Sequence, residues 1–360
     1  MLSSARGDLI GRLLTLLGKR NKLVCGAVAA AFSAMHPGLA EACTISASIA
    51  TDLGSYSPSA VKAAAVPALR SRAGLSCSPG VLMLLSGNYI RATYQSRSAL
   101  KLVQVGGAGA AVPYVLSADP NGTVVAPQNG TIDYMQNNLL NLLGLLGGSS
   151  ADFPFYVRPS ATLPIVEGVY TDRITIKWDW YLCQGVGALG LCLLGADSGT
   201  ATTVVDVVLT VAAKRLSVAL TSATTWDPVN GSRFPKALPG SKRRISVSIT
   251  NPDIVETDSP VTVVVPLPAG QAFAPDGDGM AGGPVVALSS SSAGAPQTLS
   301  YVGPASEADD VDFSADAGLT WTHVPTSTDG ASNTTAIRLR PQGKVPAGAT
   351  ISISFPASVR

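Results

Sequence analysis

The sequence is poor in the residues that most often carry chemistry. It contains two histidines, and charged residues make up 13% and aromatic residues 6% of its 360 residues. Ordinary soluble proteins contain about 25% charged residues. Residues 1–42 hold five of the 25 basic and two of the 23 acidic residues, which leaves 20 basic and 21 acidic residues beyond them. No basic stripe with interleaved aromatics occurs, so nucleic-acid binding is not expected.

Patterns for metal binding and catalysis are also scarce. No Cys-x-x-Cys occurs and His323 is the one histidine beyond residue 42, so a zinc cluster is not expected. No Gly-x-Ser-x-Gly turn accompanies His323, and the carboxylates of residues 305–316 are too scattered for an acid–base pair. Asp276-Gly277-Asp278-Gly279 begins like a calcium loop but lacks the later ligands, and residues 307–312 remain a candidate for weak calcium binding. We expect no enzyme, no cofactor and no metal centre.

An export signal is the first feature that is present. Residues 1–22 are basic and partly apolar, and residues 23–33 form an apolar run too short to span a bilayer. Ala40-Glu41-Ala42 is the small-x-small pattern that signal peptidase recognises. We predict cleavage between Ala42 and Cys43. The alternatives are a buried N-terminal helix and a lipid on Cys43, although Ala40-Glu41 matches the lipidation pattern poorly.

Four cysteines remain after this cleavage, and export brings them into an oxidising compartment. Four cysteines allow three pairings. We predict Cys43–Cys77 and Cys183–Cys192, because the partners are close in sequence and the two pairs lie about a hundred residues apart. Each such disulfide stabilises a fold by roughly 2–4 kcal/mol.

Strands and turns dominate the mature sequence, and the fold class predicted is all-β. Residues 172–182 alternate between apolar and polar, and residues 202–213 are rich in valine. The apolar face of the first segment carries Ile174, Ile176, Trp178 and Trp180. Asn-Gly at 121–122 and at 129–130 predicts hairpin turns, which we prefer to N-glycosylation sites. Residues 214–224 are predicted to join the two halves of the chain.

A helical period is weak and confined to residues 59–70 and 135–148, of which the second is a short helix or an apolar loop. That second run carries Leu139, Leu140, Leu142, Leu143, Leu145 and Leu146. Core packing is the plainer interpretation. The functional one is an exposed loop that adheres to apolar surfaces.

The second half reads as another all-β unit without cysteine. From Trp226 onward, proline, serine, threonine and aspartate increase, and residues 243–251, 334–343 and 349–358 alternate. Residues 260–268 form a strand closed by prolines. About 135 residues with this pattern suit a β-sandwich. The predicted organisation is a signal peptide (1–42) and two sandwich domains (43–213 and 214–360).

Three segments of the first half carry a family resemblance. They are CTISASIATDLGSYSPSA from Cys43, GLSCSPGVLMLLSGNYIRAT around Cys77, and Gly168-Val169-Tyr170-Thr171-Asp172 followed by RITIKWDW. Together they resemble the spore coat U domain, whose family contains the archaic, Csu-type chaperone–usher pilins. The Cys183–Cys192 insertion and the valine-rich segment after it depart from that family. The resemblance therefore does not decide which strand is the last one of this domain.

The resemblance implies a mechanism of assembly. Pilins of this class are immunoglobulin-like sandwiches that lack one strand, so an apolar groove lies between two unpaired backbone edges. A periplasmic chaperone lends a strand first, and the N-terminal extension of a neighbouring pilin subunit then replaces it. The implied partners are that chaperone, an outer-membrane usher and the neighbouring subunit. The implied route runs through the periplasm to a fimbrium on the cell surface.

Cleavage before Cys43 bears on the place in a fibre. A donor extension has to precede the first bridged cysteine and needs about a dozen residues, since a strand rises about 3.3 Å per residue. The predicted mature chain has none, which suggests a tip or otherwise terminal subunit. Its C-terminal sandwich would be a binding or spacer domain.

A second resemblance covers residues 217–358. WDPVNGSRFPKALPGSKRRISVSITNPD and DFSADAGLTWTHVP resemble conserved repeat β-sandwich domains of bacterial surface proteins. Two functions stay open on this evidence. One is an adhesive or structural pilus subunit that assembles by donor-strand complementation. The other is a stand-alone secreted or lipid-anchored surface protein whose sandwich is completed internally, with residues 202–213 as the candidate strand.

Overall fold

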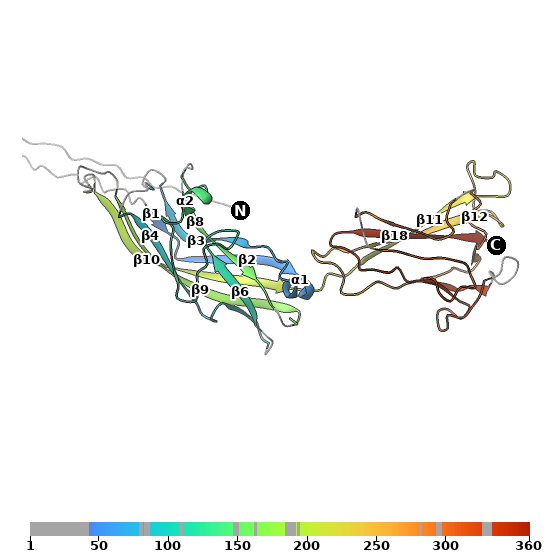
Figure 1. Cartoon of the computed structure of the whole chain (residues 1–360), viewed down its shortest axis with the longest axis horizontal. Helices are drawn as coiled ribbons and strands as arrows, with labels where there is room; N and C mark the ends of the chain where they lie inside the picture. The colour runs from blue at the N-terminus through green and yellow to red at the C-terminus, as the bar shows by residue number, and fades with distance from the viewer. Residues whose placement is uncertain are drawn as a thin grey trace, which may run out of the picture. The chain divides into compact units, whose positions relative to one another are not determined.

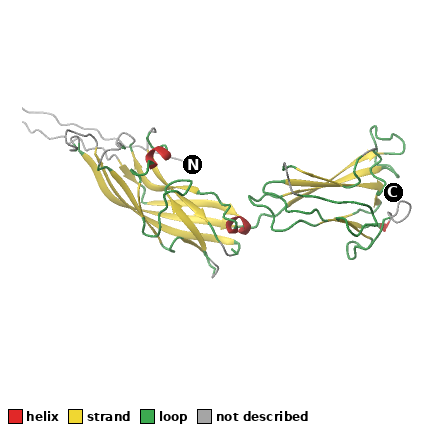
Figure 2. Cartoon of the chain, in the orientation of Figure 1, coloured by secondary structure: helices red, strands yellow, loops and turns green. Residues whose placement is uncertain are grey.

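The structure is a computed structural model that describes residues 43–78, 82, 87–107, 111–146, 151–161, 164–183, 192, 195–280, 283–292, 297–325 and 333–360. The predicted signal segment lies outside these residues. Strands dominate the described chain, which confirms the all-β prediction (Figures 1 and 2). Its helices are α1 (Pro58–Lys62) and α2 (Leu139–Leu142). Among the described residues, no helix is long and apolar enough to cross a membrane.

The N-terminal sandwich has two layers of strands. The first layer has the order β1 (Cys43–Ile45), β3 (Leu69–Cys77), β8 (Ala151–Pro159) and β6 (Val112–Ser117). The second has the order β7 (Thr131–Asp133), β4 (Tyr89–Ser96), β9 (Gly168–Cys183), β10 (Ala196–Val211) and β2 (Ser48–Tyr56). At one edge β5 (Lys101–Gln104) pairs with both β6 and β9. At the other edge the chain itself passes from β1 in one layer to β2 in the other.

Trp178 of β9 ties the two layers together. The predicted alternation is confirmed, since Ile174, Ile176, Trp178 and Trp180 are all buried. Trp178 packs on Phe153 of β8 with ring centroids 6.1 Å apart. Its indole N–H donates to the Ala73 carbonyl of β3 at 3.0 Å. The largest buried side chain therefore leaves no polar atom unpaired.

Both Asn-Gly pairs lie in turns. Asp119 shapes the first turn, because its carboxylate accepts the N–H groups of Asn121 at 3.0 Å and Val124 at 2.8 Å. In the second, Asn129 adopts a left-handed conformation with φ of 60°. The weak helical signal at 59–70 was too long, since α1 ends at Lys62 and β3 begins at Leu69.

The C-terminal sandwich also has two layers. The first contains β11 (Ser217–Trp226), β12 (Lys242–Thr250) and β18 (Thr350–Val359) in this order, with β14 (Gln271–Phe273) and β15 (Ala287–Ser290) both beyond β18. The second contains β13 (Val263–Pro266), β17 (Ala336–Leu339) and β16 (Val311–Ser314). Its buried apolar side chains form a cluster separate from that of the N-terminal sandwich. Residues 217–224 of the segment that was predicted to join the halves belong to β11, which begins at Ser217.

Asp227 organises the Asp-Pro-Val-Asn-Gly segment after β11. Its buried carboxylate accepts backbone N–H groups from Val229 at 2.8 Å, Asn230 at 2.6 Å and Lys236 at 2.6 Å. These donors, that of Asn230 first, hold the pKa of Asp227 well below its ordinary value.

Asp227→Asn should lower the melting temperature at neutral pH, and this difference from the wild type should shrink on acidification. A depressed folded-state pKa contributes stability above the unfolded pKa of about 3.9, and this is lost as the pH falls through the folded value. Thermal unfolding between pH 7 and 2 measures it, with the exposed Glu307→Gln as the control. A difference that stays constant over this range would contradict the role.

Candidate functional site

The family resemblance implies an open groove between two unpaired backbone edges of the N-terminal sandwich, and we call the position between β2 and β9 the seam. The structure corrects that expectation, because the chain's own β10 occupies the seam. β10 pairs antiparallel with β9 along its whole length, from Ala196 opposite Cys183 to Val211 opposite Gly168. It also pairs in parallel with β2, from Val204 opposite Ser48 to Val211 opposite Tyr56. Both backbone edges of the seam are therefore hydrogen-bonded.

Alternate side chains of β10 fill the core below the seam. They are Val205, Val207, Leu209 and Val211, and all four are buried. Burying one such side chain contributes about 1.5–3 kcal/mol. The valine-rich pattern of residues 202–213 thus marks the strand that completes the sandwich, which is the alternative that the sequence left open.

Gly74 lets β10 approach the opposite layer. Thr203 of β10 is buried, and a Cβ atom built on Gly74 would lie 2.4 Å from the Thr203 side chain. Gly74 has a φ of 90°, and the pairing of β3 with β8 shifts register between Arg72 and Ser76. Only glycine accommodates both this backbone conformation and this contact.

An ion pair secures β10 on the outer face. Arg173 of β9 holds Asp206 of β10 with two hydrogen bonds, Nε to Oδ1 at 2.7 Å and Nη2 to Oδ2 at 3.0 Å. This bond and the positive charge of Arg173 lower the pKa of Asp206. Because both side chains are about half exposed, the pair adds specificity of register more than stability.

Asp172 explains why the Gly-x-Tyr-Thr-Asp segment ends in a carboxylate. It is buried beside the seam and accepts Ser96 Oγ–H at 2.5 Å, Tyr114 O–H at 2.7 Å, and the N–H groups of Ser98 at 3.1 Å and Arg173 at 2.8 Å. Burial and the charge of Asp172 raise the pKa of Tyr114. One acidic side chain thereby links β4, β6 and β9.

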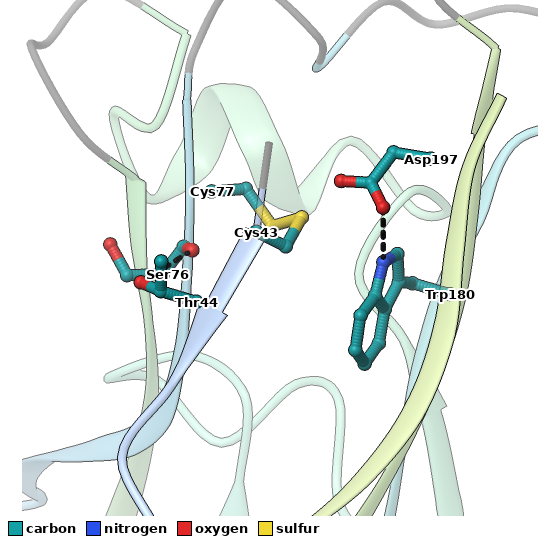
Figure 3. The surroundings of a disulfide bond; sticks show 6 residues. All are labelled: Cys43, Thr44, Ser76, Cys77, Trp180 and Asp197. Carbon is teal, nitrogen blue, oxygen red and sulfur yellow. Dashed lines mark hydrogen bonds between the residues drawn. A yellow bond between two sulfur atoms is a disulfide. The ribbon is translucent and has the colours of Figure 1, made fainter. Parts of the chain in front are cut away.

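The disulfides lie toward the end of the sandwich at which β9 ends. Cys43 at the start of β1 is bonded to Cys77 at the end of β3, and its neighbour Thr44 contacts Ser76 (Figure 3). The second disulfide joins Cys183 to Cys192 and closes the hairpin between β9 and β10. Trp180 and Asp197 form a further link across that hairpin, at 3.3 Å.

The leucine run divides between core and surface. Leu139, Leu140 and Leu145 are buried, and Leu143 packs partly against the core. Leu142 is 52% and Leu146 38% exposed. The run thus forms α2 and the turn after it, in which three leucines are buried and two are exposed.

Other candidate sites find no support in the described part of the chain. No group of three or more potential metal ligands occurs there. Asp276 and Asp278 are each paired with a cation, Lys242 at 2.7 Å and Arg244 at 2.8 Å. His323 is not in a strand, and its backbone N–H donates to the Phe313 carbonyl at 3.3 Å.

Leu209→Ala should destabilise the N-terminal sandwich by about 2–5 kcal/mol, because it leaves a cavity in the core under β10. The matched control is Val208→Ala on the outer face of the same strand, for which we expect less than about 1 kcal/mol. Urea unfolding followed by tryptophan fluorescence measures both. Equal effects of the two variants would mean that β10 does not lie in the seam.

A model of one protein family matches part of the N-terminal half of the chain. The family model for the Spore Coat Protein U domain matches residues 29–177, so the match ends within β9 and does not reach β10. No match was found among curated proteins.

Among solved structures, this chain is similar to a chain of the "CsuC-CsuE chaperone-tip adhesion subunit pre-assembly complex from archaic chaperone-usher Csu pili of Acinetobacter baumannii". The similarity covers 89% of this chain and 94% of that one, at 15% identity and a TM-score of 0.38, and it transfers no residue roles. The match to residues 29–177 supports the resemblance of the N-terminal sandwich to the Spore Coat Protein U domain.

Proposed function

We propose that the chain is an adhesive or structural subunit of a surface pilus of the chaperone–usher type. The family of the N-terminal sandwich supports this proposal, since pilins of this type carry the same domain. The partners would be a periplasmic chaperone, an outer-membrane usher and a neighbouring pilin subunit. The chain would pass through the periplasm after export and end at the cell surface.

We further propose a tip or otherwise terminal position, and the pairing of β10 carries this part. A sandwich whose seam is closed by its own strand has no need of a strand from the next subunit. The Cys43–Cys77 disulfide also holds the start of β1 inside its own sandwich, so β1 cannot be lent to a neighbour. The predicted cleavage before Cys43 would also remove any extension that could be lent, and such an N-terminal domain suits a position that ends the fibre.

Membrane attachment through Cys43 is disfavoured. A lipidated cysteine carries its lipid on the sulfur atom, and the Cys43 sulfur is bonded to Cys77. The side chain is also buried.

The adhesive part of the proposal rests on α2 and the residues after it. Leu142 and Leu146 are large apolar side chains at the surface, and their buried neighbours hold this segment in place. Little conformational entropy is therefore lost when these two side chains contact an apolar surface. The buried Leu139 and Leu140 of α2, and Leu145 in the turn after it, attach this segment to the core.

Replacing Leu142 and Leu146 together by serine should leave the melting temperature nearly unchanged and weaken adhesion to polystyrene several-fold. Both side chains are exposed, so the folded core keeps its packing. The control is Leu319→Ser, which removes an exposed leucine from the C-terminal sandwich. Adhesion that falls equally in the control would argue against α2 as the contact.

A stand-alone secreted surface protein is the second candidate, and the closed seam favours it as well. A sandwich completed within the chain can fold and persist without a chaperone. The two candidates differ in their partners, since only a pilus subunit would bind a periplasmic chaperone, an usher and a neighbouring subunit.

Co-expression of the full chain with a periplasmic chaperone encoded beside it tests the choice. A pilus subunit should co-purify with the chaperone as a 1:1 complex and accumulate less without it. A monomer of equal yield with and without the chaperone would overturn the pilus proposal and support the second candidate.

A further inference from the structure

A cavity of about 280 Å³ lies beside β16 in the C-terminal sandwich. Glu307, Asp312, Trp321, Val324 and Arg340 are among the residues that line it. They come from the loop before β16, from β16 itself, from the segment after it and from the residue after β17. The range of volumes for small-molecule sites begins at about 300 Å³, so the cavity suits a ligand of about one ring.

Trp321 forms one wall of the cavity and is held in place on two sides. The guanidinium carbon of Arg338 lies 4.7 Å from the ring centroid, so it covers one face of the indole. Gly318 packs beside the six-membered ring, since a Cβ atom built on it would lie 3.3 Å from Trp321 Cζ2. The ring is only partly buried, and it gives the cavity an apolar surface of fixed orientation.

Hydrogen bonds to β16 fix the chain on both sides of Trp321. Before it, the Asp316 carboxylate accepts Ser314 Oγ–H at 2.6 Å, and it accepts the N–H and Oγ1–H of Thr320 at 2.9 and 2.7 Å. These bonds, that of Ser314 first, lower the pKa of Asp316 to about 2, so its carboxylate is ionised at neutral pH. After it, the backbone N–H of His323 donates to a carbonyl of β16 at 3.3 Å.

The loop that carries Glu307 is fixed as well. Asp309 is buried, and its carboxylate accepts the N–H groups of Val302 at 2.9 Å and Val311 at 3.1 Å. Both walls of the cavity are therefore formed before a ligand binds, which reduces the conformational entropy that binding costs.

Charged groups of both signs lie at the cavity. Asp312 accepts hydrogen bonds from Arg338 Nε at 2.8 Å and from Arg340 Nη2 at 3.2 Å. Arg340 Nε is buried and lies 3.1 Å from Asp312 Oδ2 without making a hydrogen bond, so one N–H of Arg340 is left without an acceptor. Glu307 is exposed, and its carboxylate is open to a ligand in the cavity.

This lining defines the chemistry of a ligand. Trp321 favours an apolar face, whereas Arg340 and Glu307 favour groups that donate and accept hydrogen bonds. An anion would be repelled by Glu307 and a cation by Arg340, and an apolar ligand would desolvate both charges without pairing them. A neutral pyranose meets all of these demands, since its C–H bonds form an apolar face and its hydroxyl groups both donate and accept.

We propose that this cavity binds one neutral pyranose unit of a glycan. The C–H face of the sugar would lie on the Trp321 side, with one hydroxyl donating to the Glu307 carboxylate and another accepting from the Arg340 guanidinium. The inference goes beyond the proposed function and holds for a pilus subunit and a stand-alone surface protein alike, because every residue of the site belongs to the C-terminal sandwich. It gives that sandwich a ligand of its own.

The test uses the chain from residue 43 to 360 and a panel of methyl glycosides of glucose, galactose, mannose and their N-acetylated 2-amino forms. Saturation-transfer NMR and quenching of tryptophan fluorescence should show saturable binding of at least one glycoside, with a Kd on the order of 1 mM for so small a ligand. The uronate and the free amine of the same ring, which carry a charge, should bind several-fold more weakly.

Trp321→Ala should weaken this binding about tenfold or more, whereas Trp321→Phe, which keeps an aromatic face, should retain most of it. Glu307→Gln should weaken binding several-fold and leave the melting temperature unchanged, since the side chain is exposed. The matched control is Leu319→Ala, at an 85% exposed site two residues from Trp321, which should bind as the wild type does.

The site is overturned if no glycoside of the panel binds saturably, or if Trp321→Ala and Glu307→Gln both leave binding unchanged. Tighter binding of a uronate or an amine than of its neutral parent would also overturn it. Chaperone co-purification decides the pilus question separately, because it requires no sugar.

Discussion

Backbone pairing on both sides of β10 is the constraint on which the N-terminal sandwich depends. β9 and β2 would each present a row of unpaired N–H and C=O groups above an apolar core if β10 were absent. With β10 in place, hydrogen bonds satisfy both rows and four apolar side chains close the core. Three features support this pairing. Gly74 leaves room for Thr203 of β10, Asp172 links β9 to β4 and β6, and the Arg173–Asp206 pair joins β9 to β10.

The two sandwiches solve the same problem differently. The N-terminal one contains its final strand, and the family match stops before that strand begins. The C-terminal one has β11 at the edge of its larger sheet, with Val218 and Leu220 exposed.

Local patterns predicted much of this fold and little of its topology. Period-two alternation located β9, β12, β17 and β18, and a run closed by prolines located β13. Proximity in sequence pointed to the disulfides that the structure contains. The partner of residues 202–213 could not be predicted, because their valines fit an added strand as well as a native one. Val218 and Leu220 of β11 lie in the segment that the sequence predicted to join the two halves. Their exposure depends on the packing of the two layers, which the local sequence does not reveal. In the leucine run, the sequence alone could not predict that Leu142 and Leu146 are exposed while their neighbours are buried, because this depends on where α2 ends and the turn begins.

Amide hydrogen exchange of β10 in the purified chain tests the central claim most directly. Amides paired on both sides of a buried strand open only with the whole sandwich. We therefore expect residues 204–211 to exchange as slowly as residues 170–178 of β9, in the absence of any partner. Exchange of residues 204–211 within seconds, beside a protected β9, would contradict the account and restore the open groove.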